Sequence, residues 1–220
     1  MKVLVLGLPR TGTQSLADAL THIGFGPVYH MREVGRNNHQ ALWIEAIEDK
    51  FEGKGRPWGR EEFERILAGY EGVADYPPAI FPEELMAAYP EAAVILTVRD
   101  EDSWMASMES TLWHLYQSRP ADDPSPMNQL SRKYHEHCWG GDLPKYGKEA
   151  FRKHNELVRE AAKGRKFLEF GVGQGWEKLC EFLGVEVPEG VKWPRSDDWV
   201  DYKKMVDKER KEKEGRDKRI

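Results

Sequence analysis

The stretch from residue 7 to residue 15, GLPRTGTQS, constrains the fold of this chain more than any other part of the sequence. It follows the apolar run from Val3 to Leu6, which is typical of a strand buried on both faces. It precedes LADALTHI, where apolar residues recur with helical spacing until Gly24 ends the pattern. A strand, a glycine-bearing loop and a helix in this order predict that the loop binds an anion at the start of the helix.

The loop lacks the lysine that nucleoside triphosphate-binding loops carry after their second glycine. Gly7 and Gly12 have the required spacing, but Thr13 stands in the place of the lysine, and Arg10 is the only basic residue in the loop. We therefore expect an anion other than the phosphates that a kinase holds through that lysine. The expected donors are the Arg10 guanidinium, the backbone amides from Thr11 to Gln14, and the hydroxyl groups of Thr11, Thr13 and Ser15.

The rest of the chain alternates expected strands and helices. Strands that alternate with helices imply a parallel sheet covered on both faces, and 220 residues suffice for one such domain. We predict a single three-layer α/β domain of the P-loop type, with about five parallel strands. Further strands are expected at residues 27–29, 72–76, 93–98 and 166–170, and further helices at 42–51, 61–68, 104–112, 151–162 and 176–183.

Two segments fall outside this alternation. Residues 120–147 are rich in proline, glycine, histidine and tryptophan, and we expect an insertion with partial helix that is a candidate lid. Residues 200–220 are highly charged with little to bury, so we expect a solvated helix that ends in a disordered tail. The domain itself is expected to span residues 1–199.

Polar residues stand at, near or just after the ends of the expected strands. They are Arg10, His30, Asp75, Arg99 and Glu169. Because ligands of parallel sheets lie beyond the carboxyl ends of the strands, these residues are expected to mark the edge of one site.

Two motifs and a later segment resemble those of the sulfotransferase family. PRTGTQS is similar to the family's 5′-phosphosulfate loop. Pro9, Gly12 and Thr13 match the family pattern, and Arg10 stands in the place of the usual lysine. The motif VILTVRDEDSWMAS supplies Arg99 at a strand end and Ser107 in the next helix. The segment FGVGQGWEKLCEFLGVEVPEGVKWPR resembles a sulfotransferase-like branch of P-loop proteins that is common in fungi.

The resemblance implies a donor, an acceptor and residue roles. The donor in the family is 3′-phosphoadenosine 5′-phosphosulfate, and its product is adenosine 3′,5′-bisphosphate. Residues Pro9 to Ser15 match the loop that holds the 5′ end, and Arg99 and Ser107 match the residues that bind the 3′-phosphate. The implied reaction transfers a sulfuryl group to a hydroxyl of a small molecule and requires no metal.

Asp75 stands where cytosolic members of the family carry a catalytic histidine. Three roles remain open for it: a general base, a cap of the turn before Pro77, or a magnesium ligand. His30 is the second candidate for the base. The chain also lacks the Arg-Lys-Gly-x-x-Gly segment with which cytosolic members close the nucleotide site.

Composition limits the expected partners. The net charge is −5, so the surface as a whole is not expected to attract nucleic acid or anionic membranes, and no apolar stretch approaches the length of a membrane span. Cys138 and Cys180 are far apart in sequence, which fits a reducing cytoplasm better than a disulfide framework. The run HEHC at residues 135–138 has no partner pair at ligand spacing, so no metal site is expected. A homodimer is left open.

Three functions remain in competition. Sulfuryl transfer to a small-molecule hydroxyl leads, because both motifs occur in the family's order. A small-molecule kinase that uses a nucleoside triphosphate and magnesium is disfavoured by the absent lysine. A sulfotransferase-like scaffold without transfer activity is favoured by the missing C-terminal nucleotide segment.

Overall fold

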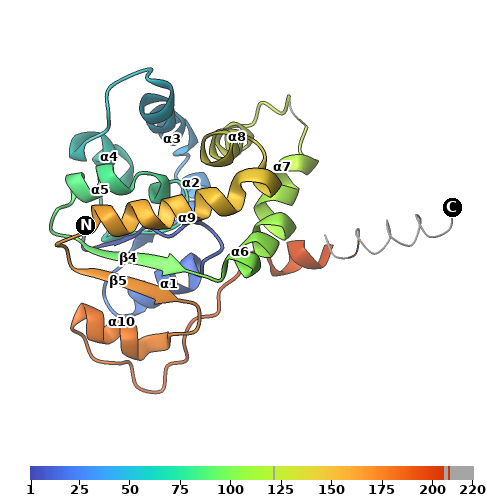
Figure 1. Ribbon diagram of the computed structural model, residues 1–220. Helices are drawn as coiled ribbons and strands as arrows, with labels where there is room; N and C mark the ends of the chain where they lie inside the picture. The colour runs from blue at the N-terminus through green and yellow to red at the C-terminus, as the bar shows by residue number, and fades with distance from the viewer. Residues whose placement is uncertain (121, 206–207, 209–220) are drawn as a thin grey trace.

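The computed structural model describes residues 1–120, 122–205 and 208 (Figure 1). Among these residues, five strands form one parallel sheet in the order β2-β3-β1-β4-β5, which confirms the predicted α/β fold. The strands are β1 (Val3–Val5), β2 (Val28–Tyr29), β3 (Gly72–Val73), β4 (Ala93–Val98) and β5 (Phe167–Gly171).

Strand β1 lies at the centre of the sheet, where Val3 pairs with Gly72 of β3 on one side and with Ala93 of β4 on the other. The chain leaves β1 for the β2–β3 side and later returns to the β4–β5 side. The connections therefore diverge at the carboxyl end of β1, and that is where doubly wound sheets bind their ligands.

Alternate side chains of each strand face two separate cores. Val3 and Val5 face the smaller core, whereas Leu4 faces the larger one, as the two-residue period of a strand requires. Helices α1 (Thr13–His22) and α10 (Gly175–Leu183) cover the smaller core. In Figure 1, α10 lies below the sheet and α1 overlaps its strands in the view, whereas most of the remaining helices lie above the sheet or at its right-hand end.

The larger core lies on the opposite face of the sheet. Its helices contribute large aromatic side chains, including the fully buried Trp43 and Trp104. The helices are α2 (Met31–Arg36), α3 (Gln40–Ile47), α4 (Arg60–Leu67), α5 (Pro82–Ala88), α6 (Glu101–Met108), α7 (His114–Ser118), α8 (Pro126–Trp139) and α9 (Leu143–Ala161). A π-helical turn extends α3 (Glu48–Glu52), another joins α6 to α7 (Glu109–Trp113), and a 3-10 turn (Pro78–Ile80) precedes α5.

Several boundaries differ from the expectation. Helices α2 and α5 are not predicted by the sequence, because both are short and show little periodicity. Helix α9 begins at Leu143 rather than at residue 151, since Asp142 caps it and accepts a hydrogen bond from Lys145 N (3.1 Å). Strand β3 ends at Val73, so Asp75 lies beyond the strand rather than at its end.

The segment at 120–147 is built into the helical layer. Helix α8 packs against α3 and α9, and its role as a lid stays a prediction. The described end of the chain is helical at residues 200–205 and lies beside α6 in Figure 1. The Tyr202 hydroxyl lies 3.0 Å from His114 Nδ1. Of the charged helix and tail predicted at residues 200–220, residues 206–207 and 209–220 lie outside the described residues.

Candidate active site

The loop between β1 and α1 is held tightly by its neighbours. A Cβ atom at Gly7 would lie 2.0 Å from Thr97 Oγ1, so only glycine allows this approach to β4. Gly12 has a φ of 92° and caps α1 without a side-chain hydrogen bond, which leaves the start of the helix open to a ligand. Trp104 is fully buried and donates from Nε1 to the carbonyl oxygen of Pro9 (2.9 Å).

Two of the predicted hydroxyl donors of the loop, those of Thr11 and Thr13, have different surroundings. The Thr11 hydroxyl is buried and donates to the carbonyl oxygen of Leu8 (2.6 Å), so it is committed inside the loop. Thr13 Oγ1 instead lies 3.4 Å from Nε2 of His30 and lines the central cavity. The sequence pattern cannot distinguish the two, because both threonines stand beside Gly12.

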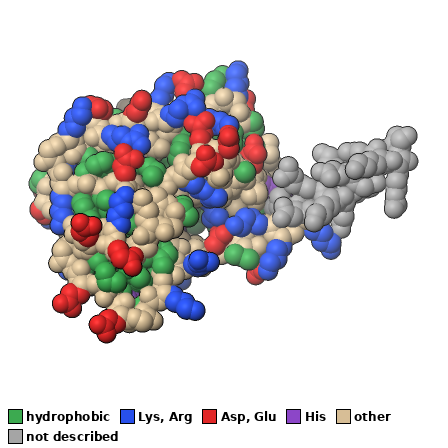
Figure 2. Space-filling model, turned by 60° about the horizontal axis from the view of Figure 1, so that its bottom comes forward, with side chains coloured by type: hydrophobic (Ala, Val, Ile, Leu, Met, Phe, Trp, Pro, Cys, Tyr) green, Lys and Arg blue, Asp and Glu red, His purple; other side chains and the backbone are tan. Residues whose placement is uncertain are grey.

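Arg10, Arg99 and Ser107 come together beside the loop, although they belong to two separate motifs. Arg10 Nε donates to Ser107 Oγ (3.1 Å), and Arg99 Nη1 donates to the carbonyl oxygen of Arg10 (2.9 Å). Burial lowers the pKa of the Arg99 guanidinium, and the nearby charge of Arg10 lowers it further. Figure 2 shows basic and acidic side chains interspersed over one face of the molecule, so no broad basic field covers that face.

Residues 196–205, which we call the C-terminal strap, cross the loop between β1 and α1 (residues 7–15), which we call the phosphate loop. Asp197 Oδ1 lies 3.1 Å from Arg10 Nη2. Ser196 N donates to Ser15 Oγ (3.1 Å), so the third predicted hydroxyl donor of the loop is already bonded to the strap. The chain therefore places its own carboxylate on the arginine that was predicted to hold the donor.

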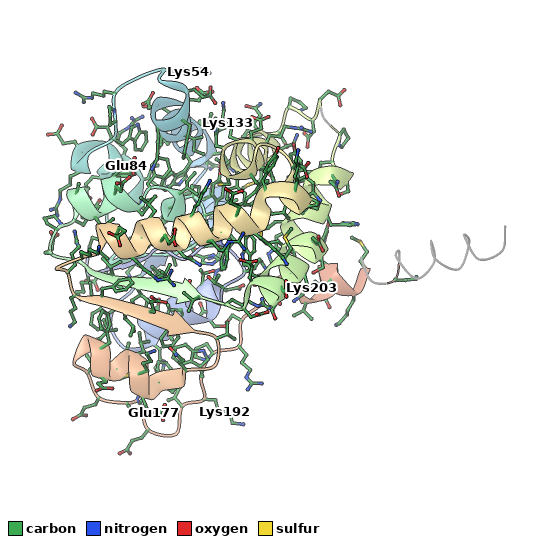
Figure 3. All side chains as sticks on the ribbon, viewed as in Figure 1. Lys54, Glu84, Lys133, Glu177, Lys192 and Lys203 are labelled. Atoms are coloured by element: carbon green, nitrogen blue, oxygen red, sulfur yellow. The ribbon has the colours of Figure 1, made fainter. Side chains whose placement is uncertain are left out.

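Two further contacts fix the strap. Asp198 N donates to Gln14 Oε1 (3.2 Å), and Lys203, labelled in Figure 3 beside α6, forms an ion pair with Asp197. Burial opposes the charge of Asp197, but the hydrogen bond from Lys203 and the charge of Arg10 outweigh it, so its pKa is lowered. Sequence reasoning missed Asp197, because the run SDDW resembles an ordinary solvated turn and its partner lies 187 residues away.

Asp75 and His30 meet on the other side of the loop, in what we call the Asp75 corner. His30 Nδ1 accepts from Arg32 N (3.5 Å) at the start of α2, which places the ring proton on Nε2. That Nε2 lies 3.3 Å from Asp75 Oδ2. Burial lowers the pKa of His30 although the Asp75 charge opposes the shift, so the imidazole is neutral at pH 7.

The backbone and burial of Asp75 are unusual. Its φ is 69°, a left-handed conformation in which aspartate is enriched among residues other than glycine. The residue is only 8% exposed, and among the described residues its Oδ1 atom has no hydrogen-bond partner. A buried carboxylate oxygen without a partner costs free energy, so this position is suited to a ligand that completes it.

A cavity of about 580 Å³ joins the loop, the Asp75 corner and the strap. A second hollow of about 400 Å³ lies on the far side of Gly12 and includes Phe170, Trp193 and Arg195. Both hollows are bounded by Ser196 and Asp197 of the strap. The polar lining of the larger cavity includes Arg10, Thr13, His30, Asp75 and Arg99, and its apolar lining includes Met31, Leu112, Met127, Tyr134 and Trp199.

Other polar residues singled out in the sequence lie away from the cavity. Glu169 forms an ion pair with Arg159 of α9 (2.6 Å), so it does not mark the edge of the site. His135 is buried and accepts from Trp139 Nε1 (3.0 Å), whereas His137 is paired with Glu52 on the surface. Within the described ranges, no group of three or more His, Cys, Asp and Glu residues is placed to hold a metal ion.

Comparison with known proteins identifies the family of this chain. Residues 2–202 match the family model described as Sulfotransferase domain. The chain belongs to the sulfotransferase domain family. It is also similar to Ava biosynthesis cluster protein M of Aspergillus versicolor. The two sequences are 37% identical over an alignment of 238 residues, which covers 94% of this chain and 90% of the relative.

The match to the sulfotransferase domain covers the whole of the site. It includes the phosphate loop, Arg99, Ser107 and the strap as far as Tyr202. In the part of this sulfotransferase-family chain that the structure describes, no helix combines the length and apolarity needed to cross a bilayer. The expected cytoplasmic location stays a prediction.

Proposed function

We propose that this protein transfers a sulfuryl group from 3′-phosphoadenosine 5′-phosphosulfate to a hydroxyl group of a small molecule. The convergence of Arg10, Arg99 and Ser107 beside the loop carries the proposal. Arg10 lies far from Arg99 and Ser107 in the sequence. The fold brings the two arginines together at the start of α1, where the helix dipole also favours an anion. Membership of the sulfotransferase domain family supports the same reaction class.

The donor fits the two hollows on either side of Gly12. Backbone amides at the start of α1 and Arg10 would hold its 5′-phosphosulfate, and Arg99 with Ser107 would hold its 3′-phosphate. Phe170 and Trp193, whose ring centroids are 5.5 Å apart, offer an apolar wall for the base in the smaller hollow. Donor binding on Arg10 requires Asp197 to leave it, because both need the same guanidinium.

The reaction moves the sulfuryl group from the donor's bridging oxygen to the acceptor's hydroxyl oxygen. One S–O bond breaks and another forms, and negative charge grows on the bridging oxygen, where Arg10 and the loop amides would stabilise it. The proton of the acceptor would pass to Asp75 Oδ1, which is buried and without a partner among the described residues. Neutral His30 would hold Asp75 Oδ2 through its Nε2 proton.

The arrangement supports the base role of Asp75 over the other two. Oδ2 faces His30 rather than an amide of the turn before Pro77, which disfavours a turn cap. A magnesium ligand would be expected to have further carboxylates beside it, and the described residues hold no such group.

Nucleotide preference tests the proposal. Isothermal calorimetry should give a Kd for adenosine 3′,5′-bisphosphate at least about tenfold lower than for adenosine 5′-monophosphate, since a charged hydrogen bond contributes about 1.5–3 kcal/mol. ATP with magnesium should bind more weakly than the bisphosphate. Equal affinity for the bisphosphate and the monophosphate would remove the basis for the roles of Arg99 and Ser107.

One observation favours a second candidate, a sulfotransferase-like scaffold without transfer activity. Asp197 neutralises Arg10, the residue on which transfer depends. If the strap were a permanent closure, adenosine 3′,5′-bisphosphate would bind neither to the wild type nor to Asp197→Asn. Bisphosphate binding to either protein would decide against a permanently closed strap, and sulfuryl transfer in a single-turnover measurement would decide against a scaffold without transfer activity.

A further inference from the structure

Helix α8 places a second unpartnered polar group in the central cavity. Tyr134 lines the cavity and is 2% exposed, and its hydroxyl has no hydrogen-bond partner among the described residues. The only other cavity-lining side chain in the described part of the chain with a buried, unpartnered polar atom is Asp75. The two groups are complementary, because a tyrosine hydroxyl donates a hydrogen bond and a carboxylate oxygen accepts one.

Packing fixes the ring of Tyr134. Its centroid lies 4.2 Å from that of Tyr76 and 4.7 Å from that of Trp139. Tyr76 follows Asp75 directly, and its own hydroxyl is committed to the carbonyl oxygen of Leu130 (3.0 Å). The ring of Tyr134 is therefore held beside the Asp75 corner, and the neighbouring tyrosine cannot take over its hydrogen bond.

The state of the Tyr134 hydroxyl suits it for donation. Burial raises the pKa of Tyr134 well above its usual range, and the nearby Asp75 carboxylate acts in the same direction. The hydroxyl therefore keeps its proton at any physiological pH. A buried hydroxyl without a partner is also a cost to the folded state that an added ligand would remove.

We propose that Tyr134 binds the acceptor, donating a hydrogen bond to the oxygen of the hydroxyl group that donates its own hydrogen to Asp75 Oδ1. A single neutral hydroxyl satisfies both buried groups at once. A carboxylate would be repelled by Asp75, and an ammonium group has no lone pair for Tyr134. The role of that hydroxyl as the attacking group rests on the proposed function, whereas its recognition does not.

The rest of the cavity lining indicates the kind of acceptor molecule to which the hydroxyl group belongs. Met31, Leu112, Met127 and Trp199 line the space beyond the corner, and methionine side chains adapt to varied apolar shapes. The acceptor class is therefore an apolar body with a neutral hydroxyl at one end. The charged groups of the cavity lie in the loop, at the corner and on the strap, together with Arg32 of α2 and Arg99 after β4.

A pair of simple probes tests this inference. The affinities of 2-naphthol and naphthalene should be measured by fluorescence titration for wild type and Tyr134→Phe, each with and without adenosine 3′,5′-bisphosphate. Tyr134→Phe removes one oxygen and keeps the packed ring. It should weaken 2-naphthol by about three- to tenfold, the usual value of a neutral hydrogen bond, and leave naphthalene and the bisphosphate unchanged.

The matched control is Tyr89→Phe. Tyr89 is also fully buried, but its hydroxyl donates to Glu64 (3.0 Å) outside the cavity. This variant should keep the wild-type preference for 2-naphthol over naphthalene. A thermal melt of both variants separates loss of the fold from loss of the hydrogen bond.

Three results would overturn the role of Tyr134. They are an unchanged 2-naphthol affinity in Tyr134→Phe, an equal loss for both probes, and a wild type that does not bind 2-naphthol more tightly than naphthalene. The titrations without adenosine 3′,5′-bisphosphate test the role of Tyr134 independently of the proposed function. If the bisphosphate fails to bind while 2-naphthol discrimination persists, the sulfuryl donor is wrong and the recognition by Tyr134 stands.

Discussion

Two polar regions lie at the same end of the sheet and differ in how their groups are satisfied. At the phosphate loop, Arg10 is bonded to Ser107 and to Asp197 of the strap. At the Asp75 corner, Asp75 Oδ1 and the Tyr134 hydroxyl have no partner within the described residues. A ligand must therefore displace a chain contact at the loop, whereas at the corner it supplies contacts that the chain leaves unmade.

The two regions also differ in their ionisable groups. The loop side relies on arginines and aspartates, which keep their charge between pH 5 and 8. Buried histidines stand at the corner and behind it: His30 contacts Asp75, and His135 lies against the ring of Tyr134. Substitutions confined to one region at a time test whether the two regions act differently.

The largest effect is expected at the corner. Asp75→Asn keeps size and tolerance of a positive φ but cannot accept a proton, so single-turnover sulfuryl transfer to 2-naphthol should fall by about 10²–10⁴. Bisphosphate affinity should stay near that of the wild type. Asp102→Asn, which removes an exposed charge on α6, is the control. A rate close to wild type would leave His30 as the base.

The next effect belongs to the loop. Arg10→Ala should weaken adenosine 3′,5′-bisphosphate about tenfold to a hundredfold in calorimetry, because charged hydrogen bonds contribute about 1.5–3 kcal/mol. Binding of 2-naphthol at the corner should change far less. Arg65→Ala, which breaks a surface pair with Glu45, should leave both affinities unchanged. Unaltered bisphosphate binding in Arg10→Ala would contradict the anion role.

Acid should act through the histidines rather than the loop. Burial lowers the pKa of His135 to about 3 and also lowers that of His30, so near pH 5 the unfolded chain binds more protons than the folded one. The stability that His135 contributes is then fully present above pH 6.5 and is lost as pH falls, by up to about 1.4 kcal/mol per pH unit, a tenfold change in the folding equilibrium, and His30 acts in the same direction.

Denaturant melts between pH 7 and 5 measure this slope. His135→Gln, which retains an acceptor for Trp139 Nε1, should flatten the slope, whereas exposed His22→Gln should not. An unchanged slope in His135→Gln would show that the acid sensitivity lies elsewhere.

The smallest effect is expected at the strap. Asp197→Asn should tighten bisphosphate binding by about two- to fivefold, since partly exposed ion pairs contribute up to ~1 kcal/mol and the ligand no longer competes with a carboxylate. Asp201→Asn removes a charge of the same sign from the exposed face of the strap and should have no effect. Weaker binding in Asp197→Asn would mean that the strap assists the donor instead of competing with it.

Several site residues could be predicted because their signals are local. The loop was recognised from its neighbours in sequence, and Asp75, Arg99 and His30 were placed by the rule that parallel strands end at one edge. Glu169 failed the same rule, because it lies within β5 and pairs with Arg159. Tyr134 gave no usable signal, since a tyrosine in a proline-rich, histidine-rich segment resembles many others.

The sequence by itself determined the order of the strands and of the clearly periodic helices, the glycine positions of the loop and most of the residues that follow the strands. These depend on periodicity and backbone preference, which act over a few residues. Only the tertiary structure decided which residues meet. Arg10 joins Ser107 and Asp197 across 97 and 187 residues, and α8 brings Tyr134 beside Asp75 through its packing on α3 and α9. Such contacts follow from how helices cover a sheet, and no local pattern records them.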